Sequence, residues 1–339
     1  MSQPDFAPAL ERAITRAIAG IAAIADLKRL SGGASQETWS FDGTGANGTT
    51  PLILRRAPYG KTVQRSATAV PLATEAKVIR LAEKAGVPVP PVPYVLQDTD
   101  DLGPGYIMGR VEGETIARKI LRDAAFAEAR PKLARQCGRI LANIHAIDKA
   151  QVSDLTVVPP RAQFDQYRKI YDTYDYPHPV FEVAFKWLEQ RLPTTPELTL
   201  VHGDFRHGNL MIGPDGVRAV LDWELTHIGD PAEDLGWICV NSWRFGETHK
   251  MVGGFGDVDD LLAGYAEAGG KNMTAERVKF WEMFGTLKWG IMCMTMYQAF
   301  ADGADRSVER AAIGRRSSET EIDLVNLLYG KREQWFGIG

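Results

Sequence analysis

The chain has 339 residues, of which 45% are hydrophobic and 24% are charged, and its formal net charge at pH 7 is −4. This composition is ordinary for a folded protein of one or two domains, and the nearly balanced charge gives no overall attraction to nucleic acid or to an anionic membrane. The three cysteines lie far apart without a metal-binding spacing, which favours a reducing compartment. The apolar stretch 14–27 is interrupted by charges and is too short to span a bilayer. We therefore expect a cytoplasmic monomer or homodimer that binds neither nucleic acid nor membrane.

The N-terminal third of the chain predicts an antiparallel sheet accompanied by helices. Helices are expected over 6–24 and 72–85, where apolar residues recur with helical spacing. Strand-like segments are expected at 27–30, 37–41, 52–56, 92–96 and 105–111. The polar, glycine-rich connection 42–50 is expected to be an exposed loop.

A small, flexible loop joins the first two predicted strands. It contains Gly32, Gly33 and Ser35, and loops of such small residues can bring backbone N–H groups close to phosphate oxygens. A pair of glycines between strands is more often an ordinary turn. The loop is a candidate phosphate-binding segment mainly because it precedes the other motifs described below.

Glu75 lies on the apolar face of the second predicted helix. The apolar residues that share this face are Leu72, Val78, Ile79 and Ala82. A carboxylate on a buried face needs a partner, because an unpaired charge there is costly. A helix-capping role, or a side chain that reaches the solvent, is the alternative interpretation.

The stretch His202–Met211 and the segment Leu221–Glu224 contain the residues with the clearest chemistry. Between them, 211–220 has the pattern of a β-hairpin with a Pro-Asp-Gly turn. A hairpin brings its two ends together, and paired residues of such a ladder have Cα atoms about 4.5–5.5 Å apart. Asn209 and Asp222 are therefore expected to lie side by side, where their oxygens suit Mg²⁺.

Asp204 precedes Asn209 by five residues, which is the interval between the catalytic Asp and the metal-binding Asn of the kinase catalytic loop. Arg206 adds a positive charge where a transferred phosphoryl group would lie. One carboxylate to orient a hydroxyl, one cation and two metal ligands make a phosphoryl-transfer site. A turn-forming Asp is the simpler alternative. A zinc site built on His202 and His207 lacks a third well-placed ligand beyond Asp204.

The motif HGDFRHGNLM…LDWE…GDPAEDLGW resembles the aminoglycoside phosphotransferase and choline kinase-like superfamily, and looks most like the branch associated with acyl-CoA dehydrogenases. The resemblance implies a two-lobed, protein-kinase-like fold of the α+β class. It makes Asp204 the catalytic base and assigns Mg²⁺ to Asn209 and Asp222, with ATP or GTP as co-substrate. An N-lobe, 1–110, would bind the nucleotide. A mainly helical C-lobe, 111–339, would hold the catalytic loop and the acceptor-binding helices.

The resemblance also implies a phosphate clamp in the N-lobe. Arg55 occupies the place of the third-strand Lys that pairs with the nucleotide phosphates in kinases. Arg keeps the charge but has a different geometry, so Arg56 and Lys61 stay alternatives for this role. Glu75 would be the acid that pairs with this cation.

Five further residues are interpreted with less direct chemistry. Met108 and Arg110 fall in the hinge, whose backbone would hydrogen-bond adenine. Asp230 could cap the helix that follows. Asp234 would either support the active site or be an acid in the first helical turn, where the helix dipole stabilises a negative charge. His145 is expected to be a satisfied core histidine.

The predicted function is Mg-dependent transfer of a nucleotide γ-phosphate to a hydroxyl of a small molecule. The branch points to hydroxyacyl acceptors, and the aromatic- and Met-rich C-terminal part suits an apolar acceptor better than a polycationic aminoglycoside. Two alternatives stay open. One is an inactive nucleotide-binding module, which Arg55 favours. The other is a metal-dependent hydrolase that uses His202, Asp204, His207 and Asp222.

Overall fold

The computed structural model of the chain describes residues 6–30, 36–58, 68–195 and 197–330. The chain divides into two compact units, one made of Met1–Gly113 with Arg218–Thr226 and the other of Glu114–Val217 with His227–Gly339. The first unit contains a five-stranded sheet, and the second is mainly helical. This is the two-lobed, kinase-like α+β fold that the sequence predicts.

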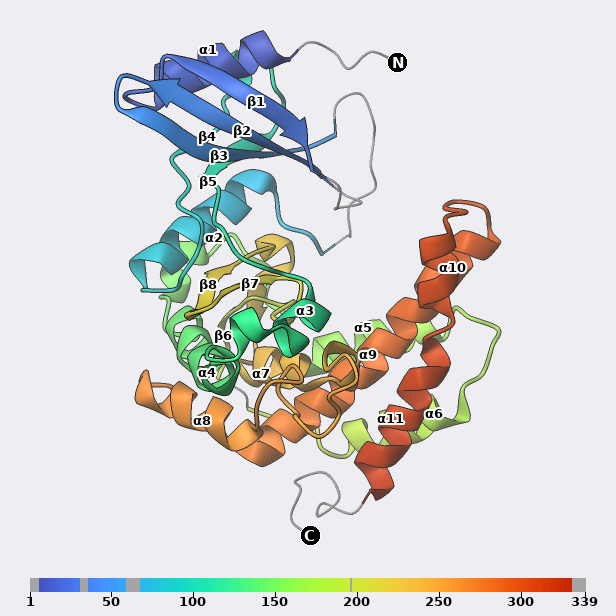
Figure 1. Cartoon of the computed structure of the whole chain (residues 1–339). Coiled ribbons are helices and arrows are strands. Elements are labelled where there is room, and N and C mark those ends of the chain that lie inside the picture. Colours follow the sequence, from blue (N-terminus) through green and yellow to red (C-terminus); the bar gives the residue numbers. More distant parts are fainter. Residues whose placement is uncertain (1–5, 31–35, 59–67, 196, 331–339) are drawn as a thin grey trace. The chain divides into compact units, whose positions relative to one another are not determined.

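Five antiparallel strands form the sheet of the first unit, in the order β1-β2-β3-β5-β4. Their bounds are Ala23–Arg29 for β1, Glu37–Gly45 for β2, Gly48–Arg56 for β3, Tyr94–Val95 for β4 and Gly105–Gly109 for β5. Across the β2–β3 ladder Trp39 pairs with Leu54 and Phe41 pairs with Leu52, so four large apolar side chains share one face. All four are buried, and α1 (Ala7–Ala17) packs with them in one core (Figure 1).

The first helix is shorter than predicted. α1 ends at Ala17 and not at Ile24. Gly20 follows with φ of +88°, a left-handed conformation that turns the chain away from the helix axis. The residues after this turn pair with β2, so that β1 begins at Ala23.

The β2–β3 ladder is longer than predicted, and β4 is shorter. Residues 42–50, expected as a loop, continue the β2–β3 ladder as far as the pair Gly45 and Gly48. Backbone pairing does not depend on side-chain polarity, so a polar composition alone misplaces the end of such a strand. The strand expected over 92–96 is reduced to Tyr94–Val95, because Pro93 has no N–H to donate to a ladder.

The second unit is built from helices and short strands. Its helices are α3 (Ala117–Arg122), α4 (Arg130–His145), α5 (Pro160–Tyr171), α6 (Pro179–Glu189), α7 (Ala232–Cys239), α8 (Val258–Glu267), α9 (Ala275–Ala301), α10 (Val308–Gly314) and α11 (Ser317–Tyr329). β6 (Thr199–Val201) pairs with β9 (His227–Gly229). β7 (Leu210–Gly213) pairs with β8 (Gly216–Val220), which is the strand where the chain passes into the segment Arg218–Thr226 of the first unit. The β7–β8 pair is the hairpin predicted between the two motifs.

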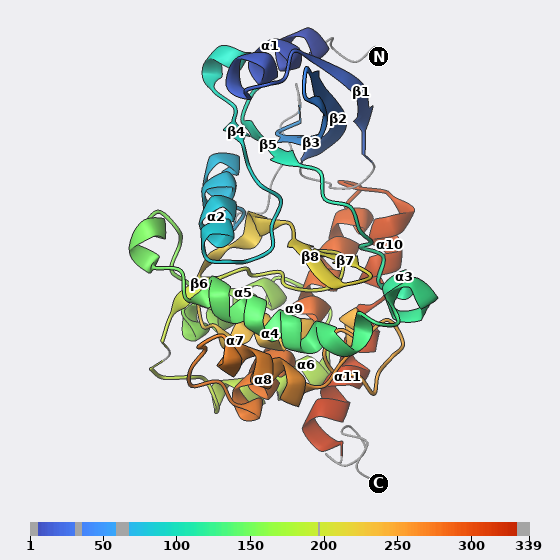
Figure 2. The same cartoon turned by 60° about the vertical axis from the view of Figure 1, so that its left-hand side comes forward.

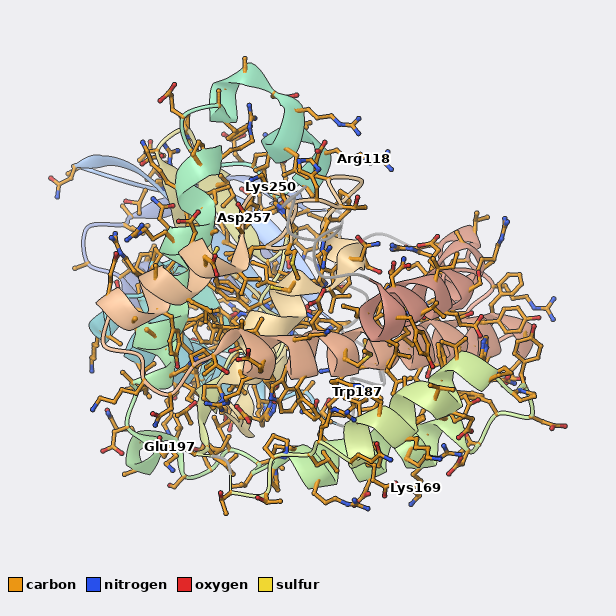
Figure 3. The ribbon with its side chains drawn as sticks, turned by 90° about the horizontal axis from the view of Figure 1, so that it is seen from below. Arg118, Lys169, Trp187, Glu197, Lys250 and Asp257 are labelled. Carbon is orange, nitrogen blue, oxygen red and sulfur yellow. The ribbon has the colours of Figure 1, made fainter. Side chains whose placement is uncertain are left out.

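The long helix α9 lies at the centre of an aromatic core. Its Phe284 packs with Phe181 and Phe185 of α6 in one buried cluster. Trp187 of α6, labelled in Figure 3, stacks on Phe280 of α9 with 6.3 Å between ring centroids. These contacts hold α9 in a fixed position along α6. Within the described residues no helix has both the length and the apolar character needed to cross a membrane.

Helices α4 and α8 approach each other closely because glycines lie at their contact. A Cβ built on Gly138 of α4 would lie 2.0 Å from the carbonyl oxygen of Leu261, and Gly264 of α8 is crowded in the same way. The two helices lie side by side in both cartoon views (Figure 1, Figure 2). This approach lets the Tyr265 hydroxyl of α8 lie 3.0 Å from Nδ1 of His145, the last residue of α4.

A buried ion pair joins α9 to the segment after α7. The Arg244 guanidinium donates to a carboxylate oxygen of Glu282 and, at 2.7 Å, to the carbonyl oxygen of Cys239. The two charged side chains are only 1% and 2% exposed. Burial raises the pKa of Glu282 to about 7, against the attraction of Arg244.

We expect Glu282→Leu to lower the free energy of unfolding by about 3–5 kcal/mol, because it leaves Arg244 buried without its charge partner. Glu282→Gln keeps a hydrogen-bonding oxygen and should cost less.

Since the folded pKa of Glu282 is raised from 4.5 to about 7, the stability that Glu282 contributes is present below about pH 4.5 and is lost as pH rises through 7. Wild type should therefore lose stability relative to Glu282→Gln between pH 5 and pH 8 in denaturant unfolding. A pH-independent difference would contradict this.

Candidate active site

Arg55 of β3 is the centre of a charged cluster in the first unit. Its Nε lies 3.3 Å from Oε1 of Glu75 in α2 (Leu72–Lys84), and its Nη2 donates to Asp222. The cross-strand neighbour of Arg55 is Tyr106, whose hydroxyl donates to the same Glu75 oxygen at 2.9 Å. Arg55 and Glu75, which the sequence nominates as a pair, are thus in contact.

The charges of this cluster do not balance. Burial works against the positive charge of Arg55, but Glu75 and Asp222 outweigh it and raise the pKa of the guanidinium. Burial also raises the pKa of Glu75, and Arg55 opposes that rise. Oε2 of Glu75 is buried and has no hydrogen-bond partner among the described residues. One guanidinium beside two carboxylates leaves the cluster able to accept a further positive charge.

Asp222 has a backbone conformation that is rare for its residue type. Its φ is 62° and its ψ is 65°, in the left-handed region that Asp tolerates better than most residues. It precedes the 3-10 turn Trp223–Leu225, which is anchored by the buried Trp223 indole donating to the carbonyl oxygen of Val220 at 3.2 Å. The carboxylate of Asp222 stays 34% exposed. Backbone strain of this kind is typical of functional positions.

The other predicted nucleotide-binding residues fall in different places. Three of them lie outside the described part of the chain: Gly32, Gly33 and Ser35. Gln36, the first described residue after them, accepts a hydrogen bond from Nε of Arg55. Met108 is in β5. Arg110 donates to Asp42 at 2.8 Å, so its side chain is turned towards β2 and is engaged there.

The alternatives to Arg55 as the phosphate clamp are placed differently. Arg56 is the next residue of β3, so its side chain lies on the opposite face of the sheet. There its guanidinium lies 4.0 Å from the ring centroid of Phe6 and pairs with Glu37 at 3.1 Å. Lys61 lies outside the described residues. Of the two described arginines, Arg55 is the one that meets Glu75.

The catalytic-loop residues of the second unit meet around Asp204. Its Oδ1 accepts from Nε1 of Trp237 at 2.7 Å and from Nε of Arg206 at 2.9 Å, and its Oδ2 accepts from Nδ2 of Asn209 at 2.7 Å. These three donors fix the orientation of a carboxylate that is still 15% exposed. The group is therefore oriented and accessible to a substrate. Asp222 belongs to the first unit, and its pairing with Asn209 stays a prediction.

One buried carboxylate holds the backbone of this loop. Asp234, in the first turn of α7, accepts from the backbone N–H groups of His202 at 2.8 Å and Gly203 at 2.9 Å. Nε2 of His145 lies 3.2 Å from the same carboxylate. Burial alone would raise the pKa of Asp234, but His145 and His202 outweigh it and lower the pKa, so the group stays ionised. Asp234 is therefore both an acid in the first turn of α7 and the side chain that supports the loop.

Arg206 is held by the loop that contains it. Its guanidinium lies 4.6 Å from the ring centroid of Trp243, and its Nη1 donates to the carbonyl oxygen of His207 at 2.8 Å. Gly208 has φ of +93°, and a Cβ there would lie 2.9 Å from the same Nη1. Arg206 therefore has a fixed position beside Asp204, and its action on a phosphoryl group stays a prediction.

The histidines of the loop have structural partners. His207 is buried with Nε2 2.7 Å from the carbonyl oxygen of Gly253, and burial lowers its pKa to about 4. Nδ1 of His202 accepts from the backbone N–H of Asp204 at 3.2 Å. Across the described residues, no group of three or more His, Cys, Asp or Glu side chains is placed to hold a metal ion. The zinc interpretation gains no support from this arrangement.

Two residues near Asp204 are not singled out by the sequence analysis. Trp237 follows Asp234 by three residues, so both side chains share the face of α7 that meets the loop. Lys288 of α9 has its Nζ 5.0 Å from the ring centroid of Trp237. One feature of the sequence could have drawn attention to Lys288: it is one of only two charged residues in the apolar stretch 280–297.

Comparison with known proteins identifies the family of the chain. Residues 26–277 match the sequence profile of the phosphotransferase enzyme family. The chain belongs to this family. The mouse protein acyl-CoA dehydrogenase family member 10 is 32% identical over 224 residues, which cover 61% of this chain and 20% of the mouse protein. This phosphotransferase thus spans about a fifth of the length of that relative.

Two solved structures share the fold of the phosphotransferase. A presumed aminoglycoside phosphotransferase from Ralstonia eutropha has a TM-score of 0.75 and 22% identity, and the match covers 94% of this chain and 97% of that one. A thermostable mutant of aminoglycoside phosphotransferase APH(4)-Ia, solved with AMP-PNP and hygromycin B, has a TM-score of 0.60 and 19% identity over 95% and 99% of the two chains. At these identities the likeness establishes the fold.

We expect Asp204→Ala to lower kcat by about 10³-fold while nucleotide binding is preserved, because this carboxylate would hold the acceptor hydroxyl and not the nucleotide. Asp259→Ala, which removes an exposed acid of α8, is the matched control. Steady-state turnover and nucleotide titration measure the two quantities. A near-normal kcat in Asp204→Ala would remove this residue from the mechanism.

Proposed function

We propose that this phosphotransferase is a magnesium-dependent kinase that transfers the γ-phosphate of ATP or GTP to a hydroxyl of a small metabolite. The observation that carries the proposal is the Asp204 carboxylate, held by Trp237, Arg206 and Asn209 and still accessible. Phosphoryl transfer depends mainly on positioning and electrostatics, which a fixed carboxylate in a rigid loop supplies. Release of ADP that requires both a hydroxyl compound and Mg²⁺ is the direct test.

In the proposed reaction the acceptor oxygen forms a bond to the γ-phosphorus, and the bond from that phosphorus to the β,γ-bridging oxygen breaks. Asp204 accepts the hydroxyl proton, and the nucleoside diphosphate leaves with the bridging oxygen. Arg206, stacked on Trp243, supplies positive charge near the transferred group. Arg55 would exchange the Asp222 carboxylate for a phosphate oxygen, since a guanidinium binds either group in a similar fork.

Asn209 and Asp222 are the residues proposed to hold Mg²⁺. Their chemistry fits this hard cation, because each offers an oxygen. Asp222 pairs with Arg55 through Oδ1, which leaves Oδ2 as a ligand, and Asn209 uses Nδ2 towards Asp204, which leaves its Oδ1. The excess of carboxylates around Arg55 favours a cation as well. When bound, Mg²⁺ would neutralise part of the phosphate charge.

The nucleotide is proposed to bind the N-lobe, 1–110, and the acceptor the C-lobe, 111–339. Support comes from the Arg55–Glu75 contact and from the fold shared with APH(4)-Ia, which was solved with the ATP analogue AMP-PNP. The proposed nucleotide-binding residues are Gly32, Gly33, Ser35, Arg55, Glu75, Met108 and Arg110. Since Asp42 engages the side chain of Arg110, its backbone would be the part that meets adenine.

We propose a hydroxyacyl compound as the acceptor. The similarity to acyl-CoA dehydrogenase family member 10 supports an acyl-related metabolite. The surroundings of Asp204 support it too, since the indole of Trp237 donates to Asp204 and packs against the indole of Trp243, with 5.3 Å between ring centroids. Aromatic walls of this kind suit a ligand with an apolar portion.

A polycationic aminoglycoside would need several carboxylates at the acceptor site. Two acids of the C-terminal part are already engaged with basic residues. Glu267 pairs with Arg139 at 2.6 Å, and Asp257 pairs with Lys250 at 3.0 Å, the latter two being labelled in Figure 3. These pairs favour an acceptor that does not depend on multiple ammonium groups.

Replacing Asp222 by Asn should weaken binding of the Mg²⁺–nucleotide complex by roughly 10- to 100-fold, because a charged ligand is removed from a hard cation. Asn209→Ala should weaken it less, and the exposed Asp175→Asn should leave it unchanged. Calorimetric titration with Mg²⁺–ATP gives these affinities. An unaltered affinity in Asp222→Asn would refute its role as a metal ligand.

The acceptor class can be tested by comparing turnover with kanamycin and with hydroxy acids or hydroxyacyl thioesters. We expect kcat/KM to be higher for the hydroxyacyl compounds, because they match the aromatic surroundings of Asp204. Phosphorylation of kanamycin at kcat/KM of about 10⁴ M⁻¹s⁻¹ or above would show the acceptor proposal to be wrong. Nucleotide binding without transfer to any hydroxyl compound would favour the inactive module.

A further inference from the structure

Lys288 is a charged residue on the inward face of the long helix α9. Phe284 and Ile291, four residues before it and three after, share this face and are buried. Lys288 itself is half-buried. Its Nζ lies 5.0 Å from the ring centroid of Trp237 in α7 and 5.7 Å from that of Tyr167 in α5. The ammonium is thus held between two aromatic rings from two other helices.

The ammonium of Lys288 has no ion-pair partner within the described part of the chain, where no carboxylate oxygen lies within 4.0 Å of it. Removing a charge from water without such a partner is costly. Contact with the two rings offsets part of this cost. Burial works against the charge, but Tyr167, Glu233 and Asp204 outweigh it and raise the pKa, so the lysine is protonated at neutral pH. A protonated, half-buried ammonium without a carboxylate is suited to bind an oxygen of a ligand.

Trp237 stands between Lys288 and Asp204. The ring of Trp237 meets the ammonium, and its N–H edge donates to Asp204 at 2.7 Å. A molecule with its hydroxyl on Asp204 therefore meets a positive charge one indole ring away. Asp204 is among the groups that raise the pKa of Lys288, so the two side chains are close enough for a chain of a few carbons to reach from one to the other.

We propose that Lys288 binds the acyl oxygen of the acceptor, a carboxylate or a thioester carbonyl, while Asp204 holds the acceptor hydroxyl. The inference rests on the proposed kinase function and narrows its acceptor to hydroxyacyl compounds whose hydroxyl lies a few carbons from the acyl group. Lys288 determines specificity and takes no part in making or breaking bonds. The same charge disfavours polycationic acceptors, because like charges repel.

The test compares Lys288→Met, which keeps length without charge, with Lys288→Arg, which keeps the charge. Lys279→Met, an exposed position on the same helix, is the matched control. The substrates are the 3-, 4-, 5- and 6-hydroxyhexanoates, their CoA thioesters, and hexanediols that lack the acyl oxygen. If Lys288→Met does not fold, Lys288→Gln takes its place.

We expect Lys288→Met to raise KM for a hydroxyhexanoate or its thioester on the order of 10- to 100-fold, with kcat changed only a few-fold. KM for the diols should stay unchanged, and Lys288→Arg should recover most of the loss. Whether the acid or the thioester responds tells which acyl oxygen is bound. An unchanged KM for both would overturn the proposal. An equal fall in kcat for the acyl compounds and the diols would also overturn it, because Lys288 would then act through Asp204.

A binding measurement separates this inference from the kinase function. Hexanoate and hexanoyl-CoA, which have no hydroxyl to phosphorylate, are titrated in the presence of Mg²⁺–AMP-PNP. Weaker binding of either to Lys288→Met, on the order of tenfold or more, supports the acyl contact even if no hydroxyl compound is phosphorylated, a result that would contradict the kinase function alone. Turnover of hydroxyacyl compounds together with Lys288-independent binding would overturn the acyl contact and leave the kinase function standing.

Discussion

The position of the catalytic loop depends on the hydrogen bonds that its backbone donates to the buried carboxylate of Asp234. Two consecutive N–H groups, those of His202 and Gly203, point at this one side chain. Backbone donors buried without acceptors are costly, so the loop has few other conformations of comparable energy. Because Asp204 is the next residue, fixing these two peptides also fixes the position of its backbone, from which the carboxylate projects. Trp237 then completes the arrangement from the same helix.

Support for Asp234 comes from further inside the second unit. His145 holds its carboxylate from the end of α4, and Tyr265 of α8 lies 3.0 Å from the other imidazole nitrogen. That chain of contacts requires α4 and α8 to approach closely, which the glycines Gly138 and Gly264 allow. The helical packing and the orientation of the Asp204 carboxylate are therefore linked by a small number of buried polar contacts, and losing them would change the conformation of the loop.

Sequence patterns identified those parts of the site that depend on local spacing. The family resemblance, and no local pattern, names Arg55 as the partner of Glu75, and the two are in contact. The hairpin between the two motifs follows from its turn residues, and the need of Glu75 for a partner follows from a carboxylate on an apolar helical face. Both signals lie within a single element. The early end of α1 at Ala17 and the length of the β2–β3 ladder depend on pairing with distant backbone, which polarity and periodicity do not encode.

Trp237 and Lys288 show why the rest of the site needed the structure. In the sequence each belongs to an apolar, aromatic helix, and most residues of that kind only pack in a core. Their closeness to Asp204 arises because α7 and α9 pack together, and no local pattern specifies which face of each helix meets the loop. Arg110 shows the reverse, because the sequence singled it out and the structure turns its side chain towards β2. Its position indicates a hinge, but its side chain is held by Asp42.

The central claim is that this loop transfers a phosphoryl group to a hydroxyl. Phosphorus NMR of the protein with ATP, Mg²⁺ and the hydroxyhexanoates or their thioesters tests it most directly. The account predicts a new phosphate monoester resonance, coupled to the proton on the carbon that bore the hydroxyl, in an amount equal to the ADP formed. ADP formed with inorganic phosphate alone would show a nucleotide hydrolase and would contradict the claim.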